Sequence, residues 1–346
     1  MKFLVYSDLQ ATDGHERCYT DQSKSLQQWR VEKFYKDLLA VYHAHKCSGL
    51  WDLGDTLDDR NAIPIPTINA VLEGIDRFPD AELNLKLIGN HEQYVKSTDV
   101  HIGRLFDRKF ALIPGVERFD FGGVQMALCS FPENPAKTTA WLEALPRKKP
   151  TIILGHFQLV GSELNNGISL EGIRQEAVSW ADIGLFGHVH KHQRLCKNTW
   201  YVGSPFQQNF GEAGQPKFVV VVDLDTLELE WVKLPGFPEY RVVGMPDFES
   251  MCTETSEDRF QVVLKGMADT EQYFSSPLAH RASPVYQYDC SSKPEDASGE
   301  ENGGLVWTAE NLFTRYMLRT PPSTRGIQLP DTDMLEFGKS IGQPET

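Results

Sequence analysis

The sequence predicts an α/β fold: a four-layer α/β/β/α sandwich followed by a smaller C-terminal α+β domain. Three observations lead to this prediction. Short apolar runs alternate with helical periodicity near the start, later strand-like runs follow one another without long helices, and a Pro-Gly-Phe-Pro segment at 235–238 interrupts the strands. The length of 346 residues also favours one large domain with a smaller one beside it.

The first 90 residues follow a β-α-β-α-β order. Apolar positions at helical spacing predict a helix over 24–46, and Pro64 and Pro66 favour the start of a second helix over 64–77. Strands are expected at residues 3–7, 49–53 and 83–88. Strands that alternate with helices are typical of a sheet with helices on its faces.

Strands predominate after residue 119. The runs 119–121 and 124–130, separated by two glycines, are typical of a hairpin, and a short helix is expected at 135–145. Further strands are expected at 150–154, 183–186, 193–196, 199–202, 217–223 and 227–232. We expect two sheet layers, each backed by helices, to accommodate this order.

Three segments are expected along the chain. Residues 1–235 would form the large domain, 239–320 the small α+β capping domain, and 321–346 an extended tail that is a candidate contact for a partner. Within the small domain, strands are expected at 240–243, 260–265 and 285–288 and helices near 247–255, 269–276 and 308–319. The last of these helices carries apolar side chains that could complete the core of the small domain or bind a partner.

The composition is that of a globular protein without a membrane span. Hydrophobic residues make up 40% and charged residues 24%, and no apolar run approaches the roughly 18 residues of a membrane helix. No signal-peptide pattern precedes the first strand, so we expect a cytoplasmic protein. The six cysteines form no CxxC pair, which favours reduced thiols. A net charge of −14 argues against broad electrostatic binding of nucleic acid.

Five polar blocks each follow an apolar run, where a buried strand would end. They are Ser7-Asp8-Leu9-Gln10, Gly54-Asp55-Thr56-Leu57-Asp58, Gly89-Asn90-His91-Glu92, Gly155-His156 and Gly187-His188-Val189-His190. Each block alone is more often a simple turn, but an α/β fold places its chemistry at such strand ends. Asp, Asn and His supply donors suited to Mn, Fe, Zn or Co. Two such sets around one shared carboxylate would hold two ions about 3.5–4 Å apart.

In order and composition, these blocks resemble those of the calcineurin-like metallophosphoesterases, D-x-H, G-D-x-x-D, G-N-H-E, G-H and G-H-x-H, over residues 1–235. The resemblance implies a first metal ion held by Asp8, Gln10, Asp55 and His190. It implies a second ion held by Asp55, Asn90, His156 and His188, with Asp55 bridging both. His91 is implied as a general acid or phosphate stabiliser.

Gln10 departs from the family pattern, which usually has histidine there. An amide oxygen is a weaker metal ligand than imidazole and cannot shuttle a proton. The sequence therefore does not fix the metal affinity of the first site. Gln10 would bind directly or through water; His15 could replace it or be an ordinary turn histidine. Asp58 is interpreted as a helix cap or a support behind the ligands, and Glu92 as a buried support.

Two features narrow the substrate class. Residues 200–212 (WYVGSPFQQNFGE) resemble the Y-x-G-S-P segment and following aromatic-acidic pair of SbcD-type nucleases, and the small domain resembles their capping domain in place and size. The resemblance implies a DNA exonuclease and endonuclease that hydrolyses phosphodiester bonds with two divalent ions, Mn²⁺ or Mg²⁺. It implies a homodimer that works with an SbcC-type, SMC-like coiled-coil ATPase in DNA repair and recombination, in a bacterial or phage-infected cytoplasm.

Two other functions stay open from the sequence. One is a stand-alone metallophosphoesterase that acts on a small nucleotide or phosphoprotein, and the other is a non-catalytic DNA-end-binding subunit, motivated by Gln10. The intact remaining blocks argue against the second. Basic side chains that could hold DNA, or could be ordinary surface charges, are Arg104, Arg108, Lys109, Arg147, Lys148, Lys149 and Lys191.

Overall fold

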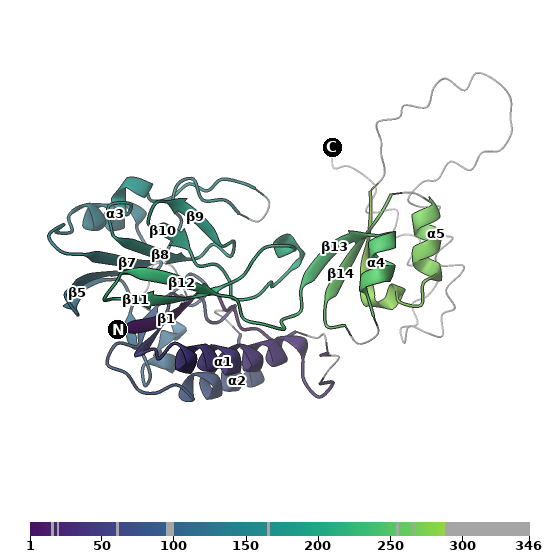
Figure 1. Cartoon of the computed structure of the whole chain (residues 1–346), viewed down its shortest axis with the longest axis horizontal. Coiled ribbons are helices and arrows are strands. Elements are labelled where there is room, and N and C mark those ends of the chain that lie inside the picture. Colours follow the sequence, from purple (N-terminus) through teal and green to yellow (C-terminus); the bar gives the residue numbers. More distant parts are fainter. Residues whose placement is uncertain are drawn as a thin grey trace, which may run out of the picture. The chain divides into compact units, whose positions relative to one another are not determined.

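The computed structural model describes residues 1–14, 17–18, 21–59, 62–94, 100–164, 167–253, 256–265 and 267–287 (Figure 1). All of them belong to one compact unit that ends at Tyr288. His15, the helix expected at 308–319 and the tail at 321–346 lie outside the described residues. Among the described residues, no helix is both long and apolar enough to cross a lipid bilayer.

The first sheet positions three of the five polar blocks. Its strands, in spatial order, are β12 (Glu228–Val232), β11 (Val219–Asp223), β1 (Lys2–Tyr6), β2 (Gly49–Asp52), β3 (Leu85–Leu87) and β4 (Ala111–Ile113). β1 to β4 run parallel, whereas β11 is antiparallel to β1. Parallel pairing brings the carboxyl ends of β1, β2 and β3 to one edge of the sheet.

The second sheet positions the two histidine blocks. Its strands, in spatial order, are β5 (Val116–Phe121), β6 (Val124–Cys129), β7 (Thr151–His156), β8 (Ile183–Gly187), β10 (Thr199–Tyr201) and β9 (Gln193–Cys196). β6, β7, β8 and β10 run parallel, and β5 and β6 form the expected hairpin. His156 is paired with Gly187, so the ends of β7 and β8 lie side by side.

Side-chain alternation along the strands separates three layers of core. Leu4 and Tyr6 of β1 pack in a cluster with the first two helices, α1 (Leu26–Ala44) and α2 (Ile65–Asp76), which lie along one face of that sheet (Figure 1). Phe3 and Val5 point the other way, into a core shared with the second sheet. The far face of the second sheet packs against α3 (Pro135–Glu143). Helices therefore flank two stacked sheets.

A separate three-stranded sheet follows β12. β13 (Tyr240–Gly244), β14 (Arg259–Leu264) and β15 (Ala282–Tyr286) are all parallel and pack with α4 (Met245–Met251) and α5 (Met267–Ser275). Met245, Phe248, Phe260 and Val262 belong to a core cluster of their own. A small β-α-β-α-β unit with parallel strands is present here, which is an α/β arrangement and not the expected α+β one; the boundaries at 239 and 320 and the capping role stay predictions.

The predicted α/β class is confirmed, and most expected elements lie within a few residues of the observed ones. β4 was not expected from the sequence, nor were the short 3₁₀ helices. These are η1 (Ile102–Phe106), η2 (Gln175–Ala177), η3 (Phe210–Glu212) and η4 (Ala279–Arg281). None of the five described cysteines forms a disulfide bond with another described residue.

Candidate metal centre

Backbone hydrogen bonds join the polar blocks at the carboxyl edge of the sheets. The N–H of Asp8 donates to the carbonyl of Gly54 at 3.0 Å, and the N–H of Gln10 donates to the carbonyl of Asp55 at 2.9 Å. From the second sheet, the N–H of His188 donates to the Asp8 carboxylate at 3.0 Å. Blocks that lie 180 residues apart in the sequence therefore meet at one place.

Four predicted ligands of the second metal ion lie together. Asp55 Oδ2 is 3.1 Å from His156 Nε2, and Asn90 Oδ1 is 2.6 Å from His188 Nδ1. Donor atoms of Asp55, His156 and His188 all lie within 4.8 Å of one another. Oxygen and nitrogen donors in this combination fit a divalent transition-metal ion.

A backbone carbonyl fixes the position of Nδ1 of His156. Its Nδ1 lies 2.7 Å from the carbonyl of Leu53, which can only accept a hydrogen bond. Nδ1 therefore carries a proton, and Nε2 is directed towards Asp55. This is the arrangement in which a histidine ligand is held by a backbone partner.

The predicted ligands of the first metal ion approach from both sheets. Asp8 is completely buried at the end of β1, and Gln208 Nε2 supports its turn by donating to the Asp8 carbonyl at 2.8 Å. His190 lies two residues after His188, with Nδ1 at 2.9 Å from Glu212 Oε1. Gln10 is half-buried on the same edge. Whether Gln10 binds a metal directly stays a prediction.

Backbone strain is concentrated at this edge. Asp8, Gln10, Asp55 and His188 have φ values of 52°, 44°, 53° and 85°, a region that L-residues rarely adopt. Each such conformation costs on the order of 1 to 3 kcal/mol and persists only where the surroundings hold it. The strain lies at residues that the sequence had singled out for metal binding.

Two glycines permit close packing of the blocks. A Cβ at Gly89 would lie 1.9 Å from Asp55 Oδ1, and a Cβ at Gly187 would lie 2.1 Å from Ser7 Oγ. Both distances are far below van der Waals contact. Glycine is therefore required sterically before Asn90 and before His188.

The titratable side chains of the centre differ widely in pKa. Burial raises the pKa of Asp55, but the neighbouring His156 outweighs it and holds the pKa at about 2. Burial lowers the pKa of His156, yet Asp55 raises it to about 9. Burial and His156 together lower the pKa of His188 to about 3. At neutral pH Asp55 is therefore ionised and His188 is neutral, the donor forms that metal ions need, whereas His156 carries a proton that a metal ion would displace.

A buried ion cluster lies beneath Asp55. The carboxylate of Glu92 accepts hydrogen bonds from the N–H groups of Asp55 at 3.2 Å and Gly89 at 3.1 Å. Lys86 Nζ lies 2.8 Å from both Glu92 and Asp52, and all three side chains are fully buried. Glu92 is thus the buried support that was expected. The role of Lys86 was not predicted from the sequence, although a lone lysine within the apolar strand LNLKLI indicates a buried charged partner.

His91 is placed by two residues. Its N–H donates to Asp55 Oδ1 at 2.9 Å, and its Nδ1 lies 2.6 Å from the carbonyl and 3.4 Å from Oδ1 of Asp58. The interpretation of Asp58 as a helix cap is wrong, because α2 begins at Ile65 after Pro64. Asp58 supports His91 instead.

Other sequence candidates lie in ordinary surroundings. His192, two residues after the predicted ligand His190, packs against Trp231, with ring centroids 4.4 Å apart, and its Nδ1 faces the carbonyl of Tyr201. Several basic candidates are already paired with carboxylates: Arg108 with Asp76, Lys109 with Asp80, Lys149 with Asp120 and Lys191 with Glu163. Each of these four cations therefore has a carboxylate partner in the structure.

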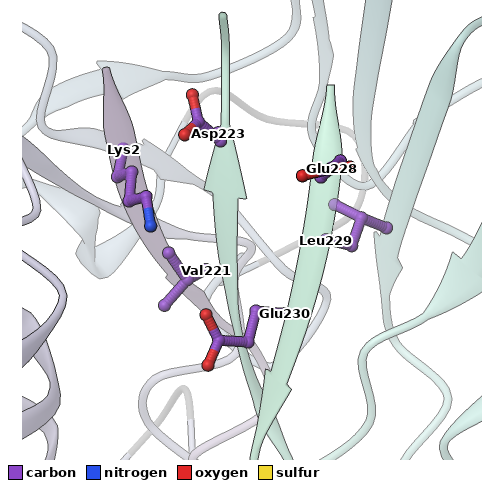
Figure 2. Close-up of a pocket in the computed structure, with 6 residues that line it drawn as sticks. All are labelled: Lys2, Val221, Asp223, Glu228, Leu229 and Glu230. Atoms are coloured by element: carbon purple, nitrogen blue, oxygen red, sulfur yellow. The ribbon is translucent and has the colours of Figure 1, made fainter. Parts of the chain in front are cut away.

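A hollow at β1, β11 and β12 lies away from the centre. Figure 2 shows Lys2, Asp223, Glu228 and Glu230 around it. Lys2 begins β1, whereas Asp8 follows the end of that strand. The hollow is therefore at the opposite end of the strand from the candidate ligands.

Comparisons with known proteins agree with a phosphoesterase centre. No protein-family model matches the chain. Exonuclease subunit 1 of Enterobacteria phage T4 is 22% identical over 290 residues, 78% of this chain and 80% of the relative. The putative phosphoesterase 244L of Invertebrate iridescent virus 6 is 22% identical over 241 residues, 64% of this chain and 83% of the relative.

Two solved structures show a partial likeness to this chain. A putative 5′-nucleotidase from Staphylococcus aureus has a TM-score of 0.40 at 17% identity, over 67% of this chain and 52% of that chain, so this chain spans about half the nucleotidase. A dimetal phosphatase from Danio rerio has a TM-score of 0.39 at 12% identity, over 65% of this chain and 92% of that one.

Proposed function

We propose that this chain, which is a calcineurin-like metallophosphoesterase distantly homologous to exonuclease subunit 1 of phage T4, is a metal-dependent DNA nuclease. The observation that carries the proposal is the position of Asp55. Its Oδ2 faces His156, and its backbone carbonyl accepts from Gln10 of the other donor set. Asp55 thus contacts both groups of donors, one through its carboxylate and the other through its backbone, and a carboxylate shared by two ions is what two-metal hydrolysis uses. The name of the phage relative supports nuclease activity, and the SbcD-type resemblance of residues 200–212 supports DNA as the substrate.

The family resemblance assigns two ligand sets around Asp55. Asp8, Gln10, Asp55 and His190 would hold the first divalent ion, and Asp55, Asn90, His156 and His188 the second; Mn²⁺ and Mg²⁺ are the expected ions. When bound, such a pair supplies an activated water and positive charge around the phosphate. The buried Asp8 and Asp55 would provide the anionic charge that attracts both cations.

His91 is proposed as the residue that handles the leaving group. The carbonyl of Asp58 accepts from its Nδ1, so Nε2 remains for the substrate. Hydrolysis breaks one P–O bond, and the departing oxygen then takes a proton. His91, with its side chain 33% exposed, can deliver that proton from Nε2 or donate a hydrogen bond to the phosphate.

Further roles rest on the SbcD-type resemblance. The small C-terminal unit would cap the centre and present DNA, and the chain would act as a homodimer with an SbcC-type ATPase. Pairing of Lys149 and Lys191 with carboxylates supports a share of DNA binding by such a partner, because neutralised cations attract phosphate less. The word subunit in the name of the phage relative agrees with a partnered enzyme.

A cleavage assay tests the proposal. The purified full chain is incubated with linear duplex DNA, single-stranded DNA and para-nitrophenyl phosphodiesters, in Mn²⁺ or Mg²⁺, with and without an SbcC-type ATPase. We expect DNA cleavage that Asp55→Asn abolishes. Asp120→Asn is the matched control, because Asp120 is exposed and far along the chain from the blocks.

One alternative has a specific observation in its favour. A relative of similar identity is named a putative phosphoesterase without reference to DNA. If the small esters are cleaved and DNA is not, even with the ATPase present, the chain is a stand-alone phosphoesterase. Failure to cleave any of these substrates would favour the non-catalytic DNA-end-binding function.

A further inference from the structure

Glu212 makes a contact that the sequence did not reveal. It belongs to η3, is completely buried, and its Oε1 lies 2.9 Å from His190 Nδ1. Its other oxygen, Oε2, receives Lys217 Nζ at 2.7 Å and the N–H of Gln208 at 3.1 Å. The carboxylate is thus held from one side by fixed donors and faces the histidine on the other.

We propose that Glu212 is a positioning residue that keeps the proton of His190 on Nδ1 and so leaves Nε2 free to bind the first metal ion. A carboxylate can only accept, so the histidine nitrogen that faces it must be the donor. The inference rests on the proposed two-metal function. It concerns a partner of the ligand and not the ligand itself.

His190 belongs only to the first donor set, where it is the one imidazole ligand. The proposed members of this set are Asp8, Gln10, Asp55 and His190, so it contains one imidazole and one weak amide donor, whereas the second set contains two imidazoles. Glu212 has no contact with His156 or His188 among the hydrogen bonds of the described residues. Loss of the Glu212 contact should therefore affect one ion and spare the other.

Glu212→Gln is the decisive variant because glutamine has one donor end and one acceptor end. Lys217 and the N–H of Gln208 are both donors, so the amide oxygen must turn towards them. The amide NH₂ then faces His190 Nδ1, which must accept. The histidine proton is forced onto Nε2, where it blocks metal binding.

The test is the binding of Mn²⁺ alone, counted by the electron paramagnetic resonance signal of the free ion. The unmodified chain is expected to bind two ions, and Glu212→Gln to retain one while the other binds about 10 to 100-fold more weakly. Glu163→Gln is the matched control, because Glu163 pairs with Lys191 next to His190 at the surface and should change nothing. Glu212→Asp keeps an acceptor and should recover part of the affinity.

A second measurement needs no variant, which covers a failure of Glu212→Gln to fold. In the unmodified chain loaded with Zn²⁺, the ¹⁵N shifts of His190 should show a protonated Nδ1 and a metal-bound Nε2. A protonated Nε2, or Glu212→Gln with two ions bound as in the unmodified chain, overturns the inference. DNA cleavage does not enter either measurement, so failure of the nuclease proposal would be seen separately in the cleavage assay.

Discussion

Lys86→Met is expected to destabilise the protein far more than the loss of a surface lysine. Lys86 is fully buried and lies 2.8 Å from the carboxylates of both Asp52 and Glu92. It also donates to Thr56 Oγ1 at 2.6 Å. Methionine fills a similar space but carries no charge. Among the described residues, Lys86 is the only cation that contacts both Asp52 and Glu92, so the two buried carboxylates lose it. Removing one partner of such a pair costs about 3 to 5 kcal/mol.

Other donors to the two carboxylates reduce this cost. Asp52 still accepts from Tyr6 at 3.0 Å and from the N–H of Gly54 at 2.9 Å, and Glu92 still accepts from the backbone of the polar blocks. A carboxylate can also take up a proton once its cation is lost. We therefore expect a loss near the lower end, about 3 kcal/mol.

Urea unfolding followed by circular dichroism at pH 7, in EDTA so that bound metal does not contribute, measures the loss. Lys149→Met is the matched control, because that lysine pairs with Asp120 at the surface, where the two side chains are 50% and 56% exposed. Exposed pairs contribute about 0 to 1 kcal/mol. If the two variants lose the same stability, the buried cluster is not the support that its geometry implies.

Further outcomes concern the centre directly. His91→Ala is expected to lower kcat about 100-fold with unchanged Mn²⁺ affinity, as for a lost general acid; steady-state kinetics with unchanged kcat would remove its role. Gln10→His should tighten one Mn²⁺ site, since imidazole is the better donor; identical calorimetric titrations would mean that another group fills that position. Gly89→Ala should abolish Mn²⁺ binding, because its Cβ would lie 1.9 Å from Asp55 Oδ1; normal binding by the folded variant would contradict this. Removal of metal by EDTA should lower Tm, because ions at 100 times Kd stabilise by about 2.7 kcal/mol; coincident melting curves would show that no ion binds the folded state.

The convergence of the blocks could be predicted from the sequence because it depends on strand ends. Short apolar runs ended at Asp8, Asp55 and Asn90, and parallel pairing carries such ends to one edge. The same reasoning placed His156 and His188 beside each other. The class of fold and the candidate donors were therefore accessible without coordinates.

Supporting contacts could not be predicted in the same way. A lysine in an apolar strand indicates an internal partner, but Asp52 lies 34 residues from Lys86 in the sequence, and only the register of β2 and β3 brings them together. The helix cap expected at Asp58 was wrong because α2 begins at Ile65, where the prolines had predicted its start and six residues too late for Asp58 to cap it. Positive φ at non-glycine residues leaves no trace in hydrophobic periodicity.

The two buried lysines of the described residues have the same arrangement: each pairs with a buried glutamate that supports the metal centre. Lys86 pairs with Glu92, which binds the backbone of the turn that carries Asp55, and Lys217 pairs with Glu212, which binds His190. Each carboxylate must stay ionised to accept from its partners, and burial alone would protonate it. A lysine that neutralises the charge inside the protein lets the carboxylate remain an acceptor. The strained turns at the strand ends are thereby held before any cation binds, so metal binding need not supply the free energy that orders them.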